Sequence, residues 1–179
     1  MFTREFVAIT VIAAAAAGCA STPVKEAPAL GKPATLEQIA SWDISVLLDG
    51  TGLPSGSGNA EQGAAVYEQK CLACHGAKGA GQPNDRLVGG QGTLATKTPV
   101  RTVGSYWPYA TTVFDYVRRA MPYAAPRSLT DDEVYAVTAY LLNLNGIIEA
   151  REQMNARTLP AVKMPNRDGF IFMVPLGAR

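Results

Sequence analysis

The stretch that indicates the fold and the kind of site most clearly is Cys71-Leu72-Ala73-Cys74-His75. Residues three apart lie on one side of a helical turn, so the two thiols face the same way. The imidazole of His75 follows at once, and His75 is the only histidine in the chain. Two thiols and one imidazole in this order suit a flat ligand that is bonded along one edge and coordinated at its centre.

This spacing is that of the c-type haem attachment motif. The thiols of Cys71 and Cys74 can add to the two vinyl groups on one edge of a porphyrin, and His75 can then approach the iron from one face. Covalent bonds hold the haem even where the protein is too small to enclose it. We therefore predict one covalent haem c, with Cys71 and Cys74 as its attachment points and His75 as an axial ligand.

Two other kinds of site use Cys-x-x-Cys. A thioredoxin-like pair lies within a strand–helix–strand pattern, whereas here the motif ends a predicted helix and a loop follows. A structural zinc site needs four ligands, and the motif supplies three. The one remaining cysteine, Cys19, is close to the N-terminus. Both alternatives match the sequence less well than haem does.

A second axial ligand is expected further along the chain. Met121, in Arg119-Ala120-Met121-Pro122, lies just before the last predicted helix. A thioether raises the reduction potential of haem iron relative to a second histidine, and the chain has no second histidine. Met164, which is also followed by proline, is the rival, and Met154 and Met173 are weaker candidates.

Length and composition limit the other possibilities. The chain has 179 residues, of which 47% are hydrophobic and 17% charged, which predicts one packed domain with appendages. Seventeen glycines and twelve prolines indicate long loops. Sixteen basic and fifteen acidic residues leave a net charge of +1, so there is no electrostatic signal for nucleic-acid binding.

The N-terminus has the features of an export signal. Residues 1–18 combine Arg4 with an apolar run that is too short to span a bilayer, which predicts a signal peptide. Ala16-Ala17-Gly18-Cys19 resembles the lipobox of bacterial lipoproteins, so Cys19 is the predicted lipidation site and 19–35 a proline-containing tether. The expected location is the periplasmic side of a bacterial membrane. Cleavage after Ala17 or Ala20, giving a soluble periplasmic protein, is the alternative.

Helix signals define a central domain at 59–146. Asn59 and Gln62 form a potential capping box for a helix that runs to about residue 70. Thr111 or Thr112 can cap a second helix, which Pro122 ends. Thr130 and Glu133 form another capping box, for a helix that ends at Gly146.

The flanking segments have weaker patterns. Residues 36–58 contain hydrophobic residues followed by glycines and a proline, which predicts a short extended arm followed by turns. Residues 147–179 lack periodicity, and we predict an irregular tail that packs on the central domain.

The order of these features resembles class I cytochrome c. In that family a first helix with a small residue and an aromatic one, here Gly63 and Tyr67, crosses a last helix with an aromatic, here Tyr140. The resemblance implies a mainly α fold with long loops around one haem. It also implies a backbone carbonyl that accepts a hydrogen bond from the haem histidine, for which Pro83 is the nearest candidate. Three further side chains are candidates for contacts with the haem propionates: Arg101, Tyr106 and Trp107.

Outside the haem motif, the sequence resembles the cytochrome subunits of sulfite and sulfane dehydrogenases, the SoxD and SorB type. The matching stretches are Trp42–Val46, Gly52–Gly58, Gly104–Thr112, Met121-Pro122, Leu129–Ala136 and Met164–Phe170. This resemblance implies a non-catalytic electron carrier. Its expected partners are a molybdenum-cofactor dehydrogenase subunit that oxidises a sulfur compound and a downstream cytochrome or oxidase. A general periplasmic electron shuttle is the alternative, and a structural lipoprotein without redox activity is a third.

Overall fold

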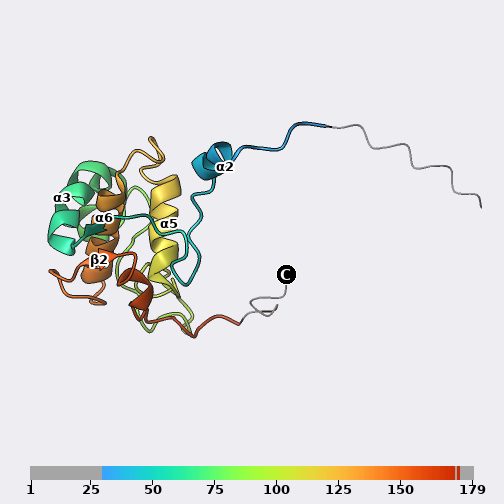
Figure 1. Ribbon diagram of the computed structural model, residues 1–179. Helices are drawn as coiled ribbons and strands as arrows, with labels where there is room; N and C mark the ends of the chain where they lie inside the picture. The colour runs from blue at the N-terminus through green and yellow to red at the C-terminus, as the bar shows by residue number, and fades with distance from the viewer. Residues whose placement is uncertain (1–29, 172, 174–179) are drawn as a thin grey trace, which may run out of the picture. The chain divides into compact units, whose positions relative to one another are not determined.

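The computed structural model describes residues 30–171 and 173 (Figure 1). The predicted signal peptide 1–18, Cys19 and the tether as far as residue 29 lie outside the described residues. The chain divides after Trp42 into two parts. The first part contains α2, Leu36–Trp42, in which no residue is buried.

The predicted extended arm is wrong for the residues of α2. Thr35 and Gln38 cap this helix reciprocally, because the N–H of each donates to the side chain of the other, at 2.9 and 3.2 Å. This Thr-x-x-Gln pattern is a helix start signal, and the prediction of an extended arm did not include it.

The second part is mainly helical, as predicted. Its helices are α3 (Ala60–Lys70), α4 (Leu72–His75), α5 (Ala110–Ala120) and α6 (Asp131–Leu144), with 3₁₀ turns η1 (Ala77–Gly79) and η2 (Leu159–Ala161). Two short strands, β1 (Ser57–Gly58) and β2 (Met154–Asn155), pair antiparallel, with Ser57 opposite Asn155. Residues 80–109 form a long connection without regular structure.

The predicted capping boxes of α3 and α6 are confirmed, at Asn59–Gln62 and Thr130–Glu133. The predicted cap of α5 is wrong, since this helix begins at Ala110 and Tyr109 is its N-cap residue without a side-chain bond. Thr111 instead lies inside the helix, and its hydroxyl donates to the carbonyl of Leu48 at 3.1 Å. The Thr111 hydroxyl therefore makes a long-range hydrogen bond instead of the local capping bond that was predicted for Thr111 or Thr112.

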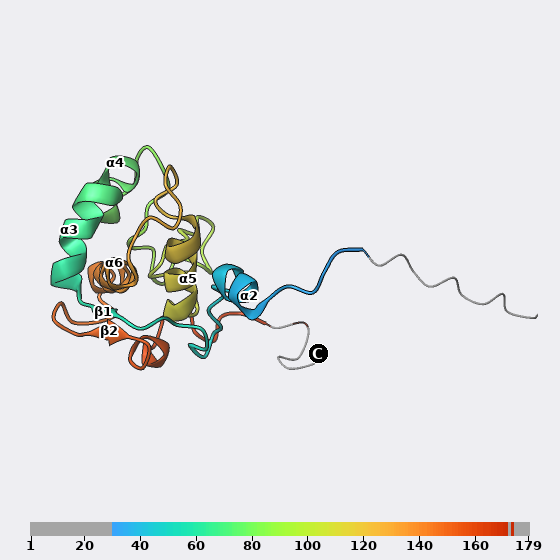
Figure 2. The same ribbon diagram turned by 45° about the horizontal axis from the view of Figure 1, so that its top comes forward.

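Helices α3 and α6 cross in close contact, as the family resemblance implied. Figure 2 looks nearly down α6, while α3 runs across the view. A Cβ atom on Gly63 would lie 1.9 Å from the carbonyl oxygen of Ala136, so only glycine allows the two backbones to approach this closely. The rings of Tyr67 and Tyr140 pack beside this crossing, with their centroids 5.3 Å apart.

The core lies between α5 and α6 and is completed by the tail. Phe114 and Tyr135 are fully buried, and their ring centroids are 4.4 Å apart. Five hydrophobic residues beyond α6 are also buried in this core: Ile148, Met154, Leu159, Val162 and Met164. The segment 147–164 is therefore part of the hydrophobic core of the domain.

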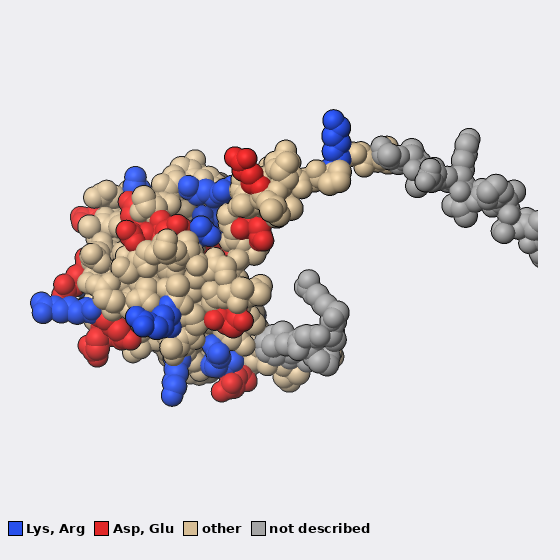
Figure 3. Space-filling model, viewed as in Figure 1, with Lys and Arg blue, Asp and Glu red and all other residues tan. Residues whose placement is uncertain are grey.

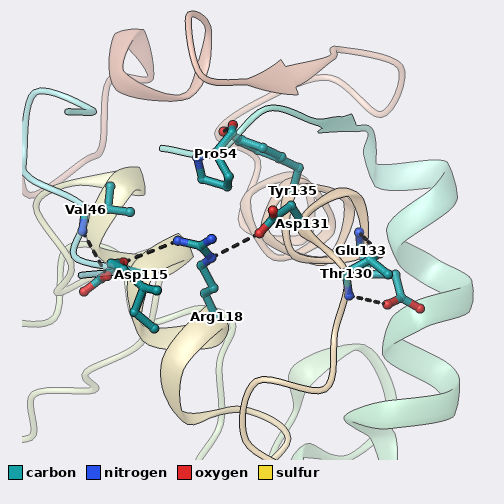
Figure 4. A network of polar contacts seen from close by, with 9 residues as sticks. Val46, Pro54, Asp115, Arg118, Thr130, Asp131, Glu133 and Tyr135 are labelled. Carbon is teal, nitrogen blue, oxygen red and sulfur yellow. Dashed lines mark hydrogen bonds and ion pairs between the residues drawn. The ribbon is translucent and has the colours of Figure 1, made fainter. Parts of the chain in front are cut away.

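Polar contacts bind residues 43–58 to α5 and α6 (Figure 4). These residues are the part of the predicted arm 36–58 that follows α2, and from here on the word arm means 43–58. The N–H of Val46 donates to Asp115 in α5, and the hydroxyl of Tyr135 in α6 donates to the carbonyl of Pro54, at 3.2 and 2.9 Å. Arg118 in α5 pairs with Asp131 at 3.1 Å and also donates to the carbonyl of Ile44.

The surface and the helices give two further facts about the described residues. On the face shown in Figure 3, acidic and basic side chains are interspersed, in keeping with the balanced composition. Among the described residues, none of the helices has the length and apolar character needed to cross a bilayer.

Candidate haem-binding site

The short helix α4 places the motif residues on one turn directly after α3. The N–H groups of Cys74 and His75 both donate to the carbonyl of Cys71, at 3.1 and 3.0 Å. Both cysteines are free thiols; Cys71 is half-buried and Cys74 is exposed. Before a haem is attached, burial, with a smaller effect from Cys74, raises the pKa of the Cys71 thiol to about 11.

His75 is held through one ring nitrogen. Its Nδ1–H donates to the backbone carbonyl of Asp85 at 3.0 Å, which leaves Nε2 for a metal ion. The predicted partner, Pro83, is therefore wrong by two residues. The loop explains the difference, because the N–H of Asn84 donates to the carbonyl of Cys74 at 2.9 Å and brings the next residue, Asp85, to the imidazole.

Glycines allow this loop to fold tightly against α4. Gly76 has φ +71°, and a Cβ there would lie 2.2 Å from the carbonyl oxygen of Gly81. The N–H of Gly81 in turn donates to the carbonyl of His75 at 2.8 Å. Since a side chain at Gly76 would meet backbone, this position admits only glycine.

Met121 and its rival occupy different environments. Met121 is the C-cap residue of α5 and is half-buried at the edge of the core. Figure 2 shows the loop that follows α5 at the same end of the domain as α4. Met164 and Met154 are 3% and 0% exposed within the core, and Met173 is 90% exposed. A ligand to haem needs a side chain at the open edge of the core, so Met121 stays the predicted second ligand.

The three predicted propionate contacts lie in one segment that is held by aromatic packing. Tyr106 lies edge-on to Phe170, with centroids 5.2 Å apart, and the guanidinium of Arg101 lies 5.6 Å from its ring. Trp107 packs edge-on to Tyr116 in α5 at 5.7 Å. Their contact with propionates stays a prediction.

One residue that supports the site, Asn145, was not predicted from the sequence, and one contact of a predicted residue, Tyr67, was not foreseen. Asn145, after α6, is 8% exposed, donates to the carbonyl of Leu87 and accepts from the N–H of Gly89. A Cβ on Gly104 would lie 2.1 Å from the Asn145 side-chain oxygen, which explains why position 104 is occupied by glycine. Asn145 directly precedes Gly146, the predicted helix end, but no local pattern indicates its contacts with Leu87 and Gly89. Tyr67 was expected at the helix crossing, but its hydroxyl also donates to the carbonyl of Gly76 at 2.8 Å.

These residues fit a covalently bound haem. The donor set is two free thiols and one oriented imidazole with an available nitrogen, which matches c-type attachment. Apolar side chains at the edge of the core are left partly uncovered: Cys71, Leu87, Trp107, Met121 and Leu129. Zinc fits less well, because no three His, Cys, Asp or Glu side chains converge anywhere in residues 30–171.

Comparison with known proteins agrees with this interpretation. Residues 58–141 match the family "Cytochrome C oxidase, cbb3-type, subunit III", whose members have c-type cytochrome domains. A chain in the crystal structure of the sulfane dehydrogenase SoxCD from Paracoccus pantotrophus is 42% identical, with a TM-score of 0.77. The similarity covers 81% of this chain and 72% of that one. The present chain therefore belongs to the c-type cytochromes, a family that carries covalent haem c.

Within that family, this protein is a cytochrome c related to the cytochrome chain of sulfane dehydrogenase. A second relative is the thiosulfate dehydrogenase of Allochromatium vinosum, which is 29% identical over 127 residues. That match covers 64% of this chain and 46% of the enzyme, so the chain spans less than half the length of that curated relative.

Proposed function

We propose that this protein is a monohaem electron carrier that accepts electrons from a molybdenum-cofactor dehydrogenase acting on sulfur compounds. It passes the electrons to a downstream cytochrome or oxidase and catalyses no substrate chemistry itself. The observation that carries the proposal is the 42% identity to a chain of the sulfane dehydrogenase SoxCD. That similarity covers 81% of the chain, so it includes residues of the arm or the tail as well as the central domain at 59–146.

The roles of the chain's own residues follow from the site. Cys71 and Cys74 would hold the haem covalently, and His75 and Met121 would bind its iron. When bound, the haem supplies a one-electron ferric–ferrous couple. With His75 and Met121 both bound to the iron, no coordination position would be open for a substrate. The bond from His75 to Asp85 keeps the imidazole in one orientation, which limits the rearrangement between the two oxidation states.

Electrons enter and leave near the attachment cysteines in this proposal. Leu72 is 39% exposed, and Ala73 and Cys74 are also exposed, so this edge of the site is accessible to a partner. Contacts between redox proteins are small, typically below about 1,200 Å². Oxidation of a sulfur compound such as sulfite releases two electrons, so a one-electron carrier must be reduced twice for each substrate molecule.

The reduction of the haem by sulfur substrates tests the proposal. Membranes that contain the protein are treated anaerobically with sulfite or thiosulfate, and the c-type α-band is recorded. A strain that lacks this chain is the control, and ascorbate gives the fully reduced level. We expect a substrate-reduced band that is absent in the control strain. Reduction by ascorbate but by neither sulfur compound would favour the alternative, a general electron shuttle.

The location is part of the same proposal. Haem c is attached outside the cytoplasm, and we infer that Cys19 carries a lipid which anchors the protein on the periplasmic side of the membrane. Several acyl chains would anchor firmly, since each buried methylene contributes about 0.8 kcal/mol. Mass spectrometry of the mature N-terminus should show a lipidated Cys19. An unmodified thiol, or cleavage after Ala20, would instead identify a soluble periplasmic protein.

A further inference from the structure

Tyr67 connects the crossing of α3 and α6 to the haem-binding turn. Its side chain is 2% exposed, and its ring packs against Tyr140 of α6 with centroids 5.3 Å apart. Its hydroxyl points away from this pair and donates to the backbone carbonyl of Gly76 at 2.8 Å. The ring therefore belongs to the helix contact, and the hydroxyl belongs to the turn after His75.

Gly76 begins the loop whose backbone groups form hydrogen bonds with His75. It follows His75 directly, and its φ of +71° turns the chain back along α4. Beyond it, the N–H of Gly81 donates to the carbonyl of His75, and the carbonyl of Asp85 accepts from Nδ1 of His75. The peptide that Tyr67 holds thus begins the loop that supplies the acceptor of the histidine.

We propose that Tyr67 is a positioning residue for His75, acting through the hydrogen bond from its hydroxyl to the carbonyl of Gly76. This bond fixes the start of the loop 76–85 and thereby keeps the carbonyl of Asp85 aligned with Nδ1 of the imidazole. The helix crossing and the axial ligand are in this way linked by one side chain. The role is independent of which protein supplies electrons, so it extends beyond the proposed function.

The hydroxyl is suited to this role because it remains a donor. Burial raises the pKa of Tyr67 to about 12, with the N–H of Gly79 acting in the opposite direction. Removing the hydroxyl leaves the Gly76 carbonyl with the longer bond from the N–H of Gly79, at 3.2 Å. The loop should then open more often, and the bond from His75 to Asp85 should weaken.

A weaker bond at Nδ1 has a consequence for the iron. A hydrogen bond from Nδ1 increases the basicity of the ligating nitrogen and so favours the ferric state. Loss of the Tyr67 hydroxyl should therefore raise the reduction potential. It should also make the Nδ1–H of His75 exchange with solvent roughly 5- to 10-fold faster, the factor that corresponds to one ordinary hydrogen bond.

The experiment compares three variants of the full-length protein loaded with haem. Tyr67→Phe removes the donor and keeps the ring, and p-aminophenylalanine at position 67 restores a donor. Tyr140→Phe removes the other hydroxyl of the same aromatic pair and is the matched control. The measurements are proton NMR of His75 Nδ1–H exchange in the ferrous state and a redox titration with chemical mediators. Neither requires a sulfur substrate, so a failure here is distinct from a failure of the proposed function.

We expect faster exchange and a higher potential in Tyr67→Phe, values close to wild type in Tyr140→Phe, and recovery with p-aminophenylalanine. If Tyr67→Phe does not fold but the p-aminophenylalanine protein does, the hydrogen-bond donor at position 67, rather than the ring, is the group that holds the loop in place. Unchanged exchange and potential in Tyr67→Phe would overturn the proposal. Equal effects of Tyr67→Phe and Tyr140→Phe, or failure of both position-67 variants to fold, would do so too, since ring packing would then be the cause.

Discussion

The haem-binding segment 71–85 and the arm 43–58 are held in place in opposite ways. The haem-binding segment is fixed mainly by main-chain bonds between near neighbours, and His75 and Asp85 are only 10 residues apart. The arm is fixed by side chains from distant helices, since Asp115 lies 69 residues from Val46 and Tyr135 lies 81 residues from Pro54. The turn that carries Cys71, Cys74 and His75 is thus encoded locally, and the position of the arm is encoded by residues far away in the sequence.

Removing the thiols tests the locally encoded region and should have the largest effect. In the double variant Cys71→Ala and Cys74→Ala, no covalent bond to a porphyrin can form. We expect complete loss of haem staining on a denaturing gel and of the pyridine haemochrome spectrum. Cys19→Ala is the matched control, because it removes the third cysteine and should leave haem attachment unchanged. Full haem retention in the double variant would show that the cofactor site lies elsewhere.

Removing a long-range contact of the arm should lower the free energy of unfolding and leave the haem attached. Asp115 is 8% exposed, accepts from the N–H of Val46 at 3.2 Å and pairs with Arg119. Asp115→Ala leaves both partners without their acceptor, so we expect a loss of about 2–4 kcal/mol in the free energy of unfolding. Urea unfolding followed by circular dichroism measures this loss, and the visible spectrum should stay that of the wild type.

A second carboxylate, that of Asp132, tests whether burial determines how much a contact with the arm stabilises the protein. Asp132 accepts from the N–H of Ser57 at 2.7 Å, also holding the arm, but it is exposed. Asp132→Ala should cost about 1 kcal/mol or less, because water can replace the lost acceptor. If the two variants lose equal stability, the burial of Asp115 is not what makes its contact strong.

This contrast explains what the sequence could and could not predict. The Cys-x-x-Cys-His motif and the capping boxes of α3 and α6 depend on neighbouring residues, and they were predictable. The close approach of Gly63 to Ala136 joins two distant helices, and only the resemblance to class I cytochrome c indicated it. The acceptor of His75 is Asp85 rather than the predicted Pro83, because the path of this glycine-rich loop depends on φ values such as +71° at Gly76, which a sequence pattern does not specify. The hydroxyl of Thr111, one of the two residues predicted as the cap of α5, instead contacts Leu48, which is 63 residues away and so leaves no local signal.

Alkaline pH probes the tyrosines of both regions. Burial raises the pKa values of Tyr67 and Tyr135 from 10.0 to about 12, with Asp131 adding to the effect at Tyr135. Between pH 10 and 12 the unfolded chain therefore loses protons that the folded protein keeps, so the free energy of unfolding should fall as pH rises. Denaturant titrations at a series of pH values measure this slope.

The two tyrosines should contribute separately to that slope. Tyr135→Phe removes the hydroxyl that holds the arm through Pro54, and Tyr67→Phe removes the one beside the haem site. Each should make the alkaline loss of stability less steep. Tyr123→Phe, whose ring is 85% exposed, is the control and should leave the slope unchanged. A slope that none of the variants alters would assign the alkaline transition to other groups.

The smallest effect is expected where a long-range contact lies in solvent. Arg151 in the tail donates to Glu61 of α3 at 2.9 Å across 90 residues of sequence, but the two side chains are 87% and 54% exposed. Exposed ion pairs contribute little, because water and salt screen them. Arg151→Ala should change the free energy of unfolding by less than about 0.5 kcal/mol, against the larger loss for Asp115→Ala. A loss comparable to that of Asp115→Ala would mean that sequence separation, rather than burial, determines how strongly a contact holds the arm and tail on the domain.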